Sequence, residues 1–315
     1  MLKRACLAGA VLSLAVGLAC GDRTGLVVDD TFVAEDSGLH DAGRDAFSDV
    51  HHDGLPMIDV AIRPDVDKKD CPDADATLVY LITEDYVLYS FYPPTADFKQ
   101  IGKIACPSMQ PGATPFSMAV DRKGIASIVF NDGELFRVST ATAACQGTTY
   151  RPGQSGFSTF GMGYASDTNG PSETLYVAGD NNGGGATGLA SIDKNYVVHA
   201  IGQFVPAIKQ SELTGTGSGD LYAFYSDKNT DPDSFIGQID KQTARVIGET
   251  RLTGVSQGNG WAFAFWGGDF YMFTSPVPGL SEVTRFRPSD GTITPLTSIR
   301  NVIVGAGVST CAPQN

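Results

Sequence analysis

The chain has 315 residues, of which 35 are Asp or Glu and 22 are Lys or Arg, so its formal net charge is −13 at pH 7. This acidity argues against a nucleic-acid ligand, because binding to phosphate backbones depends on Lys and Arg. With 37 Gly and 10% aromatic residues, the composition favours many short strands joined by tight turns.

The N-terminus has the form of a secretion signal over residues 1–19. Lys3 and Arg4 precede an apolar run from Ala5 to Leu18, which is shorter than a typical membrane-spanning helix. An ordinary secretory peptide that is cut after a small residue would show the same features.

The end of this signal, Gly17-Leu18-Ala19-Cys20, resembles the lipobox of bacterial lipoproteins. In that family the cysteine is acylated and becomes the mature N-terminus, so the resemblance implies a lipid anchor at Cys20. The sequence differs from the family pattern at Gly17, where Leu is favoured. Residue 21 is Gly rather than the Asp that retains such proteins at the inner membrane. We therefore expect an extracytoplasmic, lipid-anchored protein at the outer membrane or cell surface.

Residues 20–76 are predicted to form an acidic, disordered linker. From residue 21 to residue 76 there are fifteen Asp or Glu and five Lys or Arg. Asp41, Asp45, Asp49 and Asp53 recur every four residues, which on a helix would stack like charges. Few apolar residues oppose this repulsion, so we interpret the segment as a solvated tether. Its three histidines do not have the spacing of a closed metal site.

The stretch from residue 115 to residue 140 contains one compact repeat unit. Phe116–Val120 and Ile125–Phe130 are runs of β-branched and aromatic residues, and Asn131-Asp132-Gly133 then turns the chain into Glu134–Val138. This pattern predicts a three-strand antiparallel meander. A fourth, more polar strand is expected at Gly147–Arg151.

The same order of strands recurs along residues 77–315. Further first strands are predicted at Phe160–Ala165, Leu213–Ser218, Trp261–Trp266 and Ala306–Cys311. Further second strands are predicted at Leu78–Ile82, Leu175–Ala178, Leu221–Tyr225 and Phe270–Thr274. Third strands are predicted at Tyr86–Phe91, Gly188–Asp193, Phe235–Asp240 and Glu282–Arg287. Fourth strands are predicted at Gln100–Ala105, Val197–Phe204, Arg245–Leu252 and Ile293–Ile299.

The two ends of this series complement each other. The first unit lacks a first strand, and the last segment is a first strand with nothing after it, so pairing residues 306–311 with residues 78–82 would close a ring. This pattern resembles β-propellers, although neither Trp-Asp repeat ends nor a kelch signature is present. The sequence therefore predicts an all-β fold over residues 77–315: a five-bladed β-propeller of four-stranded blades. Small residues such as Gly161 and Gly163 are expected in the first strands, where five backbones crowd around the axis.

The cysteines predict two disulfides. Cys6 leaves with the signal and Cys20 is used by the lipid, which leaves four cysteines suited to an oxidising compartment. Cys71 precedes the first strand and Cys311 lies in the closing strand, so we predict the bridge Cys71–Cys311. Cys106 and Cys145 flank the outer strands of neighbouring blades and are predicted to form the second bridge.

The connections between second and third strands predict a binding sector. They are short in the first two blades and longer at 179–187, 226–234 and 275–281, although loop length can also drift without function. Trp261 and Trp266 are predicted to lie in the adjoining blade, and packing is an alternative role for them. The candidate ligand-binding residues are Asn181, Asn182, Asp227, Asn229, Asp231, Trp261 and Trp266.

Residue types in the propeller region do not form a recognisable catalytic set or a closed metal site. The series from Asp227 to Asp233 suits calcium in outline, but Pro232 and Gln238 stand where an EF-hand loop needs Gly and Glu. We therefore expect no cofactor, with calcium as an open alternative. The predicted function is a monomeric binding or interaction module for a protein, peptide or glycan. The alternative is an envelope hydrolase, glycosidase-like, that uses carboxylates near the axis, for which the recurring aspartates are Asp121, Asp167, Asp220 and Asp269.

Overall fold

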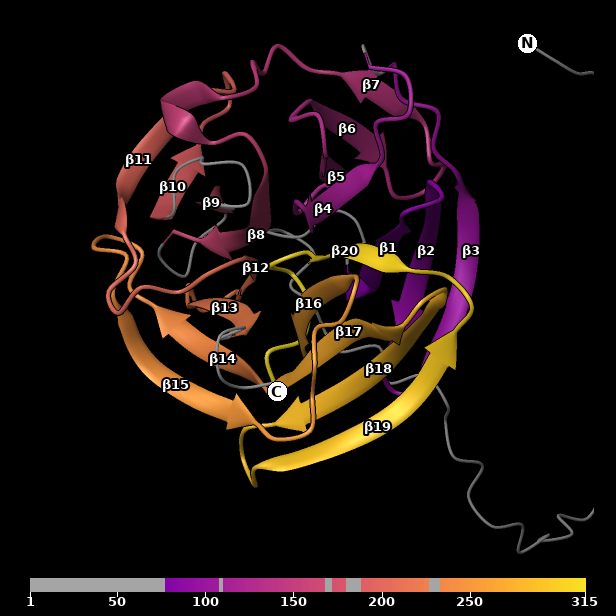
Figure 1. Ribbon diagram of the computed structural model, residues 1–315, viewed down its shortest axis with the longest axis vertical. Helices are drawn as coiled ribbons and strands as arrows, with labels where there is room; N and C mark the ends of the chain where they lie inside the picture. The colour runs from indigo at the N-terminus through magenta and orange to yellow at the C-terminus, as the bar shows by residue number, and fades with distance from the viewer. Residues whose placement is uncertain (1–76, 108–109, 168–171, 180–187, 227–232) are drawn as a thin grey trace, which may run out of the picture. The chain divides into compact units, whose positions relative to one another are not determined.

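The computed structural model describes residues 77–107, 110–167, 172–179, 188–226 and 233–315. These residues form five antiparallel sheets of four strands each, arranged as the blades of a ring (Figure 1). The predicted five-bladed β-propeller is thus confirmed. The predicted signal, Cys20 and the acidic linker lie outside the described residues. Within those residues, no helix is long and apolar enough to cross a membrane.

The strands follow one another from the axis outward in every blade. Blade 1 consists of β20 (Ile303–Val308), β1 (Val79–Thr83), β2 (Val87–Tyr92) and β3 (Asp97–Lys103). Blade 2 consists of β4 (Pro115–Val120), β5 (Ile125–Phe130), β6 (Leu135–Ser139) and β7 (Cys145–Gly147). Blade 3 consists of β8 (Phe160–Ser166), β9 (Glu173–Gly179), β10 (Gly188–Ile192) and β11 (Val198–Gln203), after a short 3₁₀ turn, η2 (Gln154–Gly156). Blade 4 consists of β12 (Ser211–Gly215), β13 (Leu221–Ser226), β14 (Ser234–Ile239) and β15 (Val246–Leu252). Blade 5 consists of β16 (Trp261–Trp266), β17 (Asp269–Val277), β18 (Leu280–Arg287) and β19 (Thr292–Ile299).

The ring is closed by the last strand, as predicted. β20 pairs with β1 in antiparallel register, with Val79 opposite Val308 and Ile82 opposite Gly305. The strand spans 303–308 rather than the predicted 306–311. The extended backbone ends there because Ser309 to Ala312 form a turn, in which the Ala312 N–H donates to the Ser309 carbonyl. The first strand of blade 4 also ends earlier than predicted, at Gly215, because Thr216–Asp220 forms the turn into β13.

Inner strands lie at the centre of Figure 1 and outer strands at its periphery. The inner strands approach one another so closely that several positions exclude any side chain. A Cβ on Gly161 of β8 would lie 1.9 Å from the Ser211 carbonyl oxygen of β12. A Cβ on Gly305 of β20 would lie 2.7 Å from the Met118 backbone nitrogen of β4. The small residues expected around the axis are therefore required by backbone contact.

The core is divided among the blade interfaces. Five clusters of buried apolar side chains occur in the described residues, each shared by two neighbouring blades. Between blades 1 and 5, for example, Phe91 and Phe273 pack edge to face with ring centroids 5.4 Å apart. Such aromatic burial holds the blades together where no ladder of hydrogen bonds joins them.

One predicted disulfide is confirmed. Cys106 and Cys145 are bonded, with Cα atoms 5.1 Å apart, and so connect the outer parts of blades 1 and 2. Cys311 is buried and disulfide-bonded. Its predicted partner, Cys71, lies outside the described residues, so that pairing stays a prediction.

Candidate functional site

The strand registers define two ends of the propeller axis. β16 begins at Trp261 opposite Thr274 and ends at Trp266 opposite Asp269. We call the end where the inner strands begin the open mouth, and the end where they finish the sealed mouth. The predicted long connections leave strands at the open mouth, since Gly179 pairs with Phe160 and Tyr225 pairs with Ser211, at the starts of β8 and β12.

A cleft of about 410 Å³ lies at the open mouth. Four of the five blades contribute to its lining, so it sits where the inner strands converge. The residues that matter chemically are Glu84, Phe116, Asn131, Glu212, Asn259 and Trp261. Trp261 and Phe116 are half-buried, whereas Glu84, Asn131 and Asn259 are exposed. Aromatic surface next to a few polar groups is typical of ligand sites.

Glu212, the second residue of β12, is among the residues that line this cleft and is only 3% exposed. Ser117 of β4 donates its hydroxyl to Glu212 Oε2 at 2.7 Å and accepts a hydrogen bond from the Met162 N–H of β8. These strands come from three different blades. The contact requires Gly161 on β8, since a Cβ there would lie 2.8 Å from the Glu212 Cα.

Five of the predicted site residues lie outside the described residues: Asn181, Asn182, Asp227, Asn229 and Asp231. The prediction of a long loop at 275–281 is wrong. β17 continues to Val277 and β18 begins at Leu280, with Val277 opposite Leu280. Gly279 has φ +74, which allows this tight turn. Blade 5 therefore uses its extra residues to lengthen two strands.

The two tryptophans predicted to share one site lie at opposite ends of β16. Trp266 is 9% exposed, donates its indole N–H to the Thr77 carbonyl at 2.5 Å, and packs edge to face against Tyr92. These contacts fit the packing alternative. Trp261 alone remains in the cleft at the open mouth.

The sealed mouth is covered by the segment that follows β20. Ser309, Thr310, Cys311 and Ala312 are all at least 95% buried. The Pro313 carbonyl accepts a hydrogen bond from the Gly267 N–H at 2.8 Å, and Gln314 Oε1 accepts one from the Gly217 N–H at 3.0 Å. The C-terminal segment is thus bound to blades 4 and 5.

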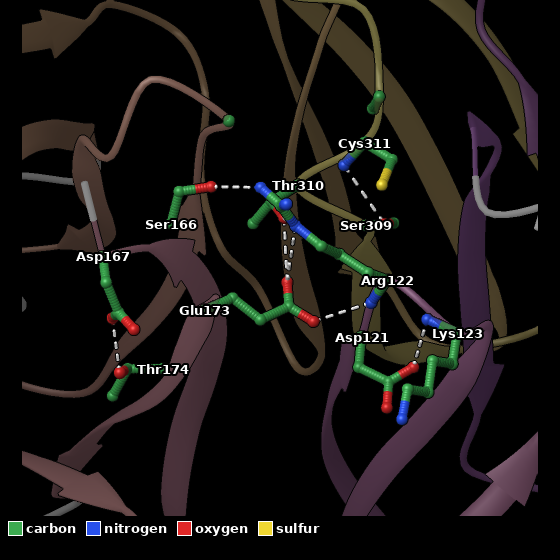
Figure 2. Close-up of polar contacts among 12 residues, drawn as sticks. Asp121, Arg122, Lys123, Ser166, Asp167, Glu173, Thr174, Ser309, Thr310 and Cys311 are labelled. Carbon is green, nitrogen blue, oxygen red and sulfur yellow. Dashed lines mark hydrogen bonds and ion pairs between the residues drawn. The ribbon is translucent and has the colours of Figure 1, made fainter. Parts of the chain in front are cut away.

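A buried polar network joins the same segment to blades 2 and 3 (Figure 2). Arg122, at the turn after β4, donates from Nε to the Thr310 hydroxyl and from Nη2 to the Ser166 hydroxyl, both at 2.7 Å. Glu173, the first residue of β9, accepts the Arg122 backbone N–H at 2.7 Å and the Thr310 hydroxyl at 2.8 Å. The guanidinium Nε is 3.9 Å from Glu173 Oε2, so this ion pair is looser than the hydrogen bonds around it.

Burial raises the pKa of Glu173 to about 7, and the nearby charge of Asp121 adds to this effect. The Arg122 N–H and the Thr310 hydroxyl act against it, because they stabilise the carboxylate. Burial also raises the pKa of Asp121, while the N–H groups of Ile125 and Lys123 lower it. Asp121 and Glu173 both line a cleft of about 440 Å³ between blades 2 and 3.

The recurring aspartates each contact residues of their own blade. Asp121 accepts N–H groups in its own turn, and Asp167 accepts the Thr174 hydroxyl at 2.6 Å. Asp220 accepts the Gln238 amide at 3.1 Å, and Asp269 lies 3.2 Å from Arg287 Nη2. These aspartates therefore stabilise turns and strand ends within single blades. Asp121 and Glu173, which line one cleft, are the pair of carboxyl groups to consider for acid–base chemistry.

The one described residue of the proposed calcium series is Asp233. It accepts hydrogen bonds from the Gly254 N–H and from Arg251 Nε, both at 2.9 Å, and these contacts lower its pKa. Across the part of the chain that the structure describes, there is no group of three His, Cys, Asp or Glu side chains placed to hold a metal ion.

A third cleft, of about 510 Å³, lies between blades 4 and 5. Tyr222, Phe265 and Phe270 line it, and these rings pack on one another, with 4.8 Å between the centroids of Tyr222 and Phe270. It is built from two blades beside the sealed mouth, whereas the cleft at the open mouth is shared by four.

Sequence reasoning missed Ser117, Arg122, Glu173, Glu212 and Thr310. One signal was present: Glu212 is the one charged residue in the inner strand SELTG. The others carry no local signal, because their partners are 44 to 188 residues away in the chain.

The five four-stranded sheets, arranged as a ring, place this protein among the β-propellers by fold. A scan against models of known protein families finds no match, and no curated protein matches the sequence. Among solved structures, a protein of unknown function from Bacteroides caccae is 13% identical over 72% of this chain and 84% of its own, with a TM-score of 0.41. A putative TolB from Agrobacterium tumefaciens is 10% identical over 75% and 81%, with a TM-score of 0.41. The Dos1 propeller is 12% identical over 76% and 72%, with a TM-score of 0.40. These values are too low to carry a functional argument.

Proposed function

We propose that this protein is a tethered binding module. In this proposal Cys20 holds a lipid, residues 20–76 form a spacer, and the propeller presents its open mouth to a protein, peptide or glycan outside the cytoplasm. The lipobox-like segment and the acidic composition of the linker support the tether. The cleft at the open mouth supports the binding role.

The observation that carries the proposal is the difference between the two mouths. The sealed mouth is covered by buried residues of the C-terminal segment, whereas the open mouth has a cleft lined by Trp261, Phe116 and polar side chains from four blades. A cleft that combines aromatic and polar side chains at one end of a rigid ring is suited to holding a ligand.

The test is a binding screen of the purified full-length protein against glycan arrays, peptide arrays and envelope fractions, with and without calcium. Trp261→Ala should weaken binding to any ligand found by at least about tenfold, which corresponds to loss of a well-packed aromatic contact. Tyr222→Ala is the matched control, because it removes a half-buried ring from the cleft between blades 4 and 5. Loss of binding in the control but not in Trp261→Ala would move the site to that cleft.

The tether is tested separately. Cys20→Ser should move the protein from the membrane fraction to the soluble fraction and prevent incorporation of a labelled fatty acid. An unchanged membrane fraction would contradict the lipid anchor without affecting the binding proposal.

A hydrolase is the second candidate, favoured by one observation. Glu173 has a pKa raised to about 7 and shares a cleft with Asp121, which suits a proton donor beside a carboxylate. Both side chains, however, already accept hydrogen bonds that hold turns and the C-terminal segment. Release of reducing sugar from envelope glycans that is abolished in Glu173→Gln would establish this activity in place of simple binding.

A further inference from the structure

We infer that the cleft between blades 4 and 5 is a second binding site, which takes a small neutral molecule with an aromatic ring and a hydroxyl group. This site is separate from the open mouth and holds a different class of ligand. It exists because blade 5 lacks a side chain that the other four blades place at such an interface.

The turn between the third and fourth strands of each blade contains one residue with positive φ, whose N–H donates to a carbonyl three or four residues earlier. These residues are Ala96, Ala143, Tyr196, Ala244 and Gly291. In the first four blades the side chain packs against the apolar cluster shared with the preceding blade of the ring. Ala143 and Ala244, for example, are 5% and 0% exposed. In blade 5 this side chain is missing, and a Cβ on Gly291 would have no atom within 4 Å.

The turn that contains Gly291 borders the cleft of about 510 Å³. Pro288, in the same turn, lines this cleft together with Gly248 in β15. A Cβ on Gly248 would meet only the Gln238 Cβ, at 4.0 Å. A glycine inside a strand often marks a place where another group approaches the backbone. Gly291 and Gly248 therefore leave space on both blades that no side chain of their own occupies.

Aromatic side chains from both blades form the wall of the cleft. The ring centroid of Tyr222, in blade 4, lies 4.8 Å from that of Phe270 and 6.4 Å from that of Phe265, both in blade 5. Phe286 lies opposite Phe270 in the register of β17 and β18, so it is on the same face of blade 5. Tyr222 and Phe265 are half-buried, so part of each ring is accessible. A further aromatic ring can pack edge to face or offset against such a wall.

The polar groups of the cleft favour a neutral ligand. Its described lining residues include no Lys, Arg or His, and their one carboxylate, that of Glu249, accepts the Tyr225 hydroxyl. An anionic ligand would therefore find no cation to pair with. Among the described residues the Tyr222 hydroxyl has no hydrogen-bond partner. Burial and the nearby charge of Asp220 raise the pKa of Tyr222, so this hydroxyl keeps its proton and can donate to a ligand oxygen.

The corresponding position of blade 3 shows which kind of group fits such an interface. Tyr196 occupies the turn position that Gly291 has in blade 5, and its ring packs against the apolar cluster between blades 2 and 3. The chain thus places a phenol ring at one interface and supplies no ring from this turn between blades 4 and 5. A free molecule with an aromatic ring and a hydroxyl group can take the corresponding place.

The test compares phenol with two molecules that each lack one of its features. Cyclohexanol keeps the hydroxyl but is not aromatic, and benzoate keeps the ring but is an anion. Saturation-transfer NMR titrations of the full-length protein at pH 7 measure the three affinities. We expect phenol to bind saturably at millimolar or lower concentration, and the other two to bind at least about fivefold more weakly.

Variants that fill the space locate the site. Gly291→Tyr gives blade 5 the residue that blade 3 has at this position, so phenol binding should be lost. Gly248→Leu fills the cleft from β15 and serves as the test if Gly291→Tyr unfolds at a lower temperature. Gly153→Tyr is the matched control, because Gly153 also has a positive φ, +79, and open space around its Cβ but does not line the cleft. Tyr222→Phe should weaken phenol binding about fivefold, through loss of one hydrogen bond.

The outcomes are separate from those of the open mouth. Trp261→Ala should leave phenol binding unchanged, and failure of the phenol test would leave the proposal for the open mouth as it stands. No saturable binding of phenol, equal binding of cyclohexanol, or binding that persists in both filling variants would overturn the inference. Loss of phenol binding in Trp261→Ala alone would place phenol at the open mouth and overturn it as well.

Discussion

The two ends of the propeller axis differ although the same five inner strands run through both. At one end residues 309–313 are buried, and the segment after β20 is bound to four blades through Arg122, Glu173, Gly217 and Gly267. At the other end, the starts of four inner strands or the residues just before them line a cleft of about 410 Å³. The comparison teaches that closing the ring and sealing one end are done by the same C-terminal segment, whereas the proposed ligand site lies at the opposite end.

Removing the Arg122 side chain should have the largest effect on the sealed mouth. Arg122→Ala deletes hydrogen bonds to the buried hydroxyls of Thr310 and Ser166. We expect the free energy of unfolding to fall by about 3 kcal/mol, since these buried groups lose their donors. Urea unfolding measures this change. A stability within error of the wild type would show that the network does not hold the C-terminal segment, and ligand binding at the open mouth should be unchanged.

The pH dependence of stability should depend on Glu173. Burial raises the pKa of its carboxyl group from 4.5, the value expected in the unfolded chain, to about 7 in the folded protein. The folded protein therefore binds the carboxyl proton more tightly than the unfolded chain does. The stability it contributes is therefore complete below pH 4.5 and is lost as the pH rises through 7. We expect a loss of about 2 kcal/mol between pH 5 and pH 8, which Glu173→Gln should largely abolish. Parallel pH profiles for the two proteins would contradict the raised pKa.

A methyl group at Gly161 should disturb the open mouth. Gly161→Ala places a Cβ against the Ser211 carbonyl, so we expect a destabilisation of about 1 to 3 kcal/mol and weaker ligand binding through displacement of Glu212. Gly248→Ala is the control, because its Cβ would lie 4.0 Å from the nearest atom, Gln238 Cβ. Thermal unfolding should separate the two variants, and similar melting temperatures would argue against close backbone contact at the axis.

The contact of Gln314 with blade 4 should have the smallest effect. Gln314→Ala removes the acceptor for the Gly217 N–H, a single neutral hydrogen bond worth about 1 kcal/mol. Hydrogen exchange at the Gly217 amide should become faster, with exchange in β16 unaffected. No change at Gly217 would show that the end of the chain adds nothing to the seal.

The architecture could be predicted from the sequence because each blade repeats one order of short strands and turns. The missing first strand at 77–105 and the spare strand near residue 306 were enough to predict ring closure. Strand ends were less predictable, since Thr216 and Ser309 begin turns that depend on hydrogen bonds within the folded chain. The extended hairpin around Gly279 was not predicted: Pro276 and Pro278 interrupt the β pattern there, yet β17 continues to Val277 and β18 begins at Leu280.

The candidate site was harder to predict for a physical reason. Trp261 and Trp266 are neighbours in the sequence, yet one strand carries them to opposite ends of the axis. Glu212 and Ser117 are separated by 95 residues and meet only because β4, β8 and β12 converge around the axis. Such contacts follow from the closed ring and have no signature in either local segment.

The central claim is that the open mouth, and not the sealed one, binds the ligand, and the two tryptophans allow a direct measurement. The chain has two Trp, so Trp266→Phe leaves only Trp261 at the open mouth, and Trp261→Phe leaves only Trp266 at the sealed mouth. Tryptophan fluorescence is followed while a ligand from the screen is added to each variant. We predict a saturable change in emission for the protein that retains Trp261 and a constant emission for the protein that retains Trp266. The reverse pattern, or binding by calorimetry with no change at Trp261, would contradict the claim.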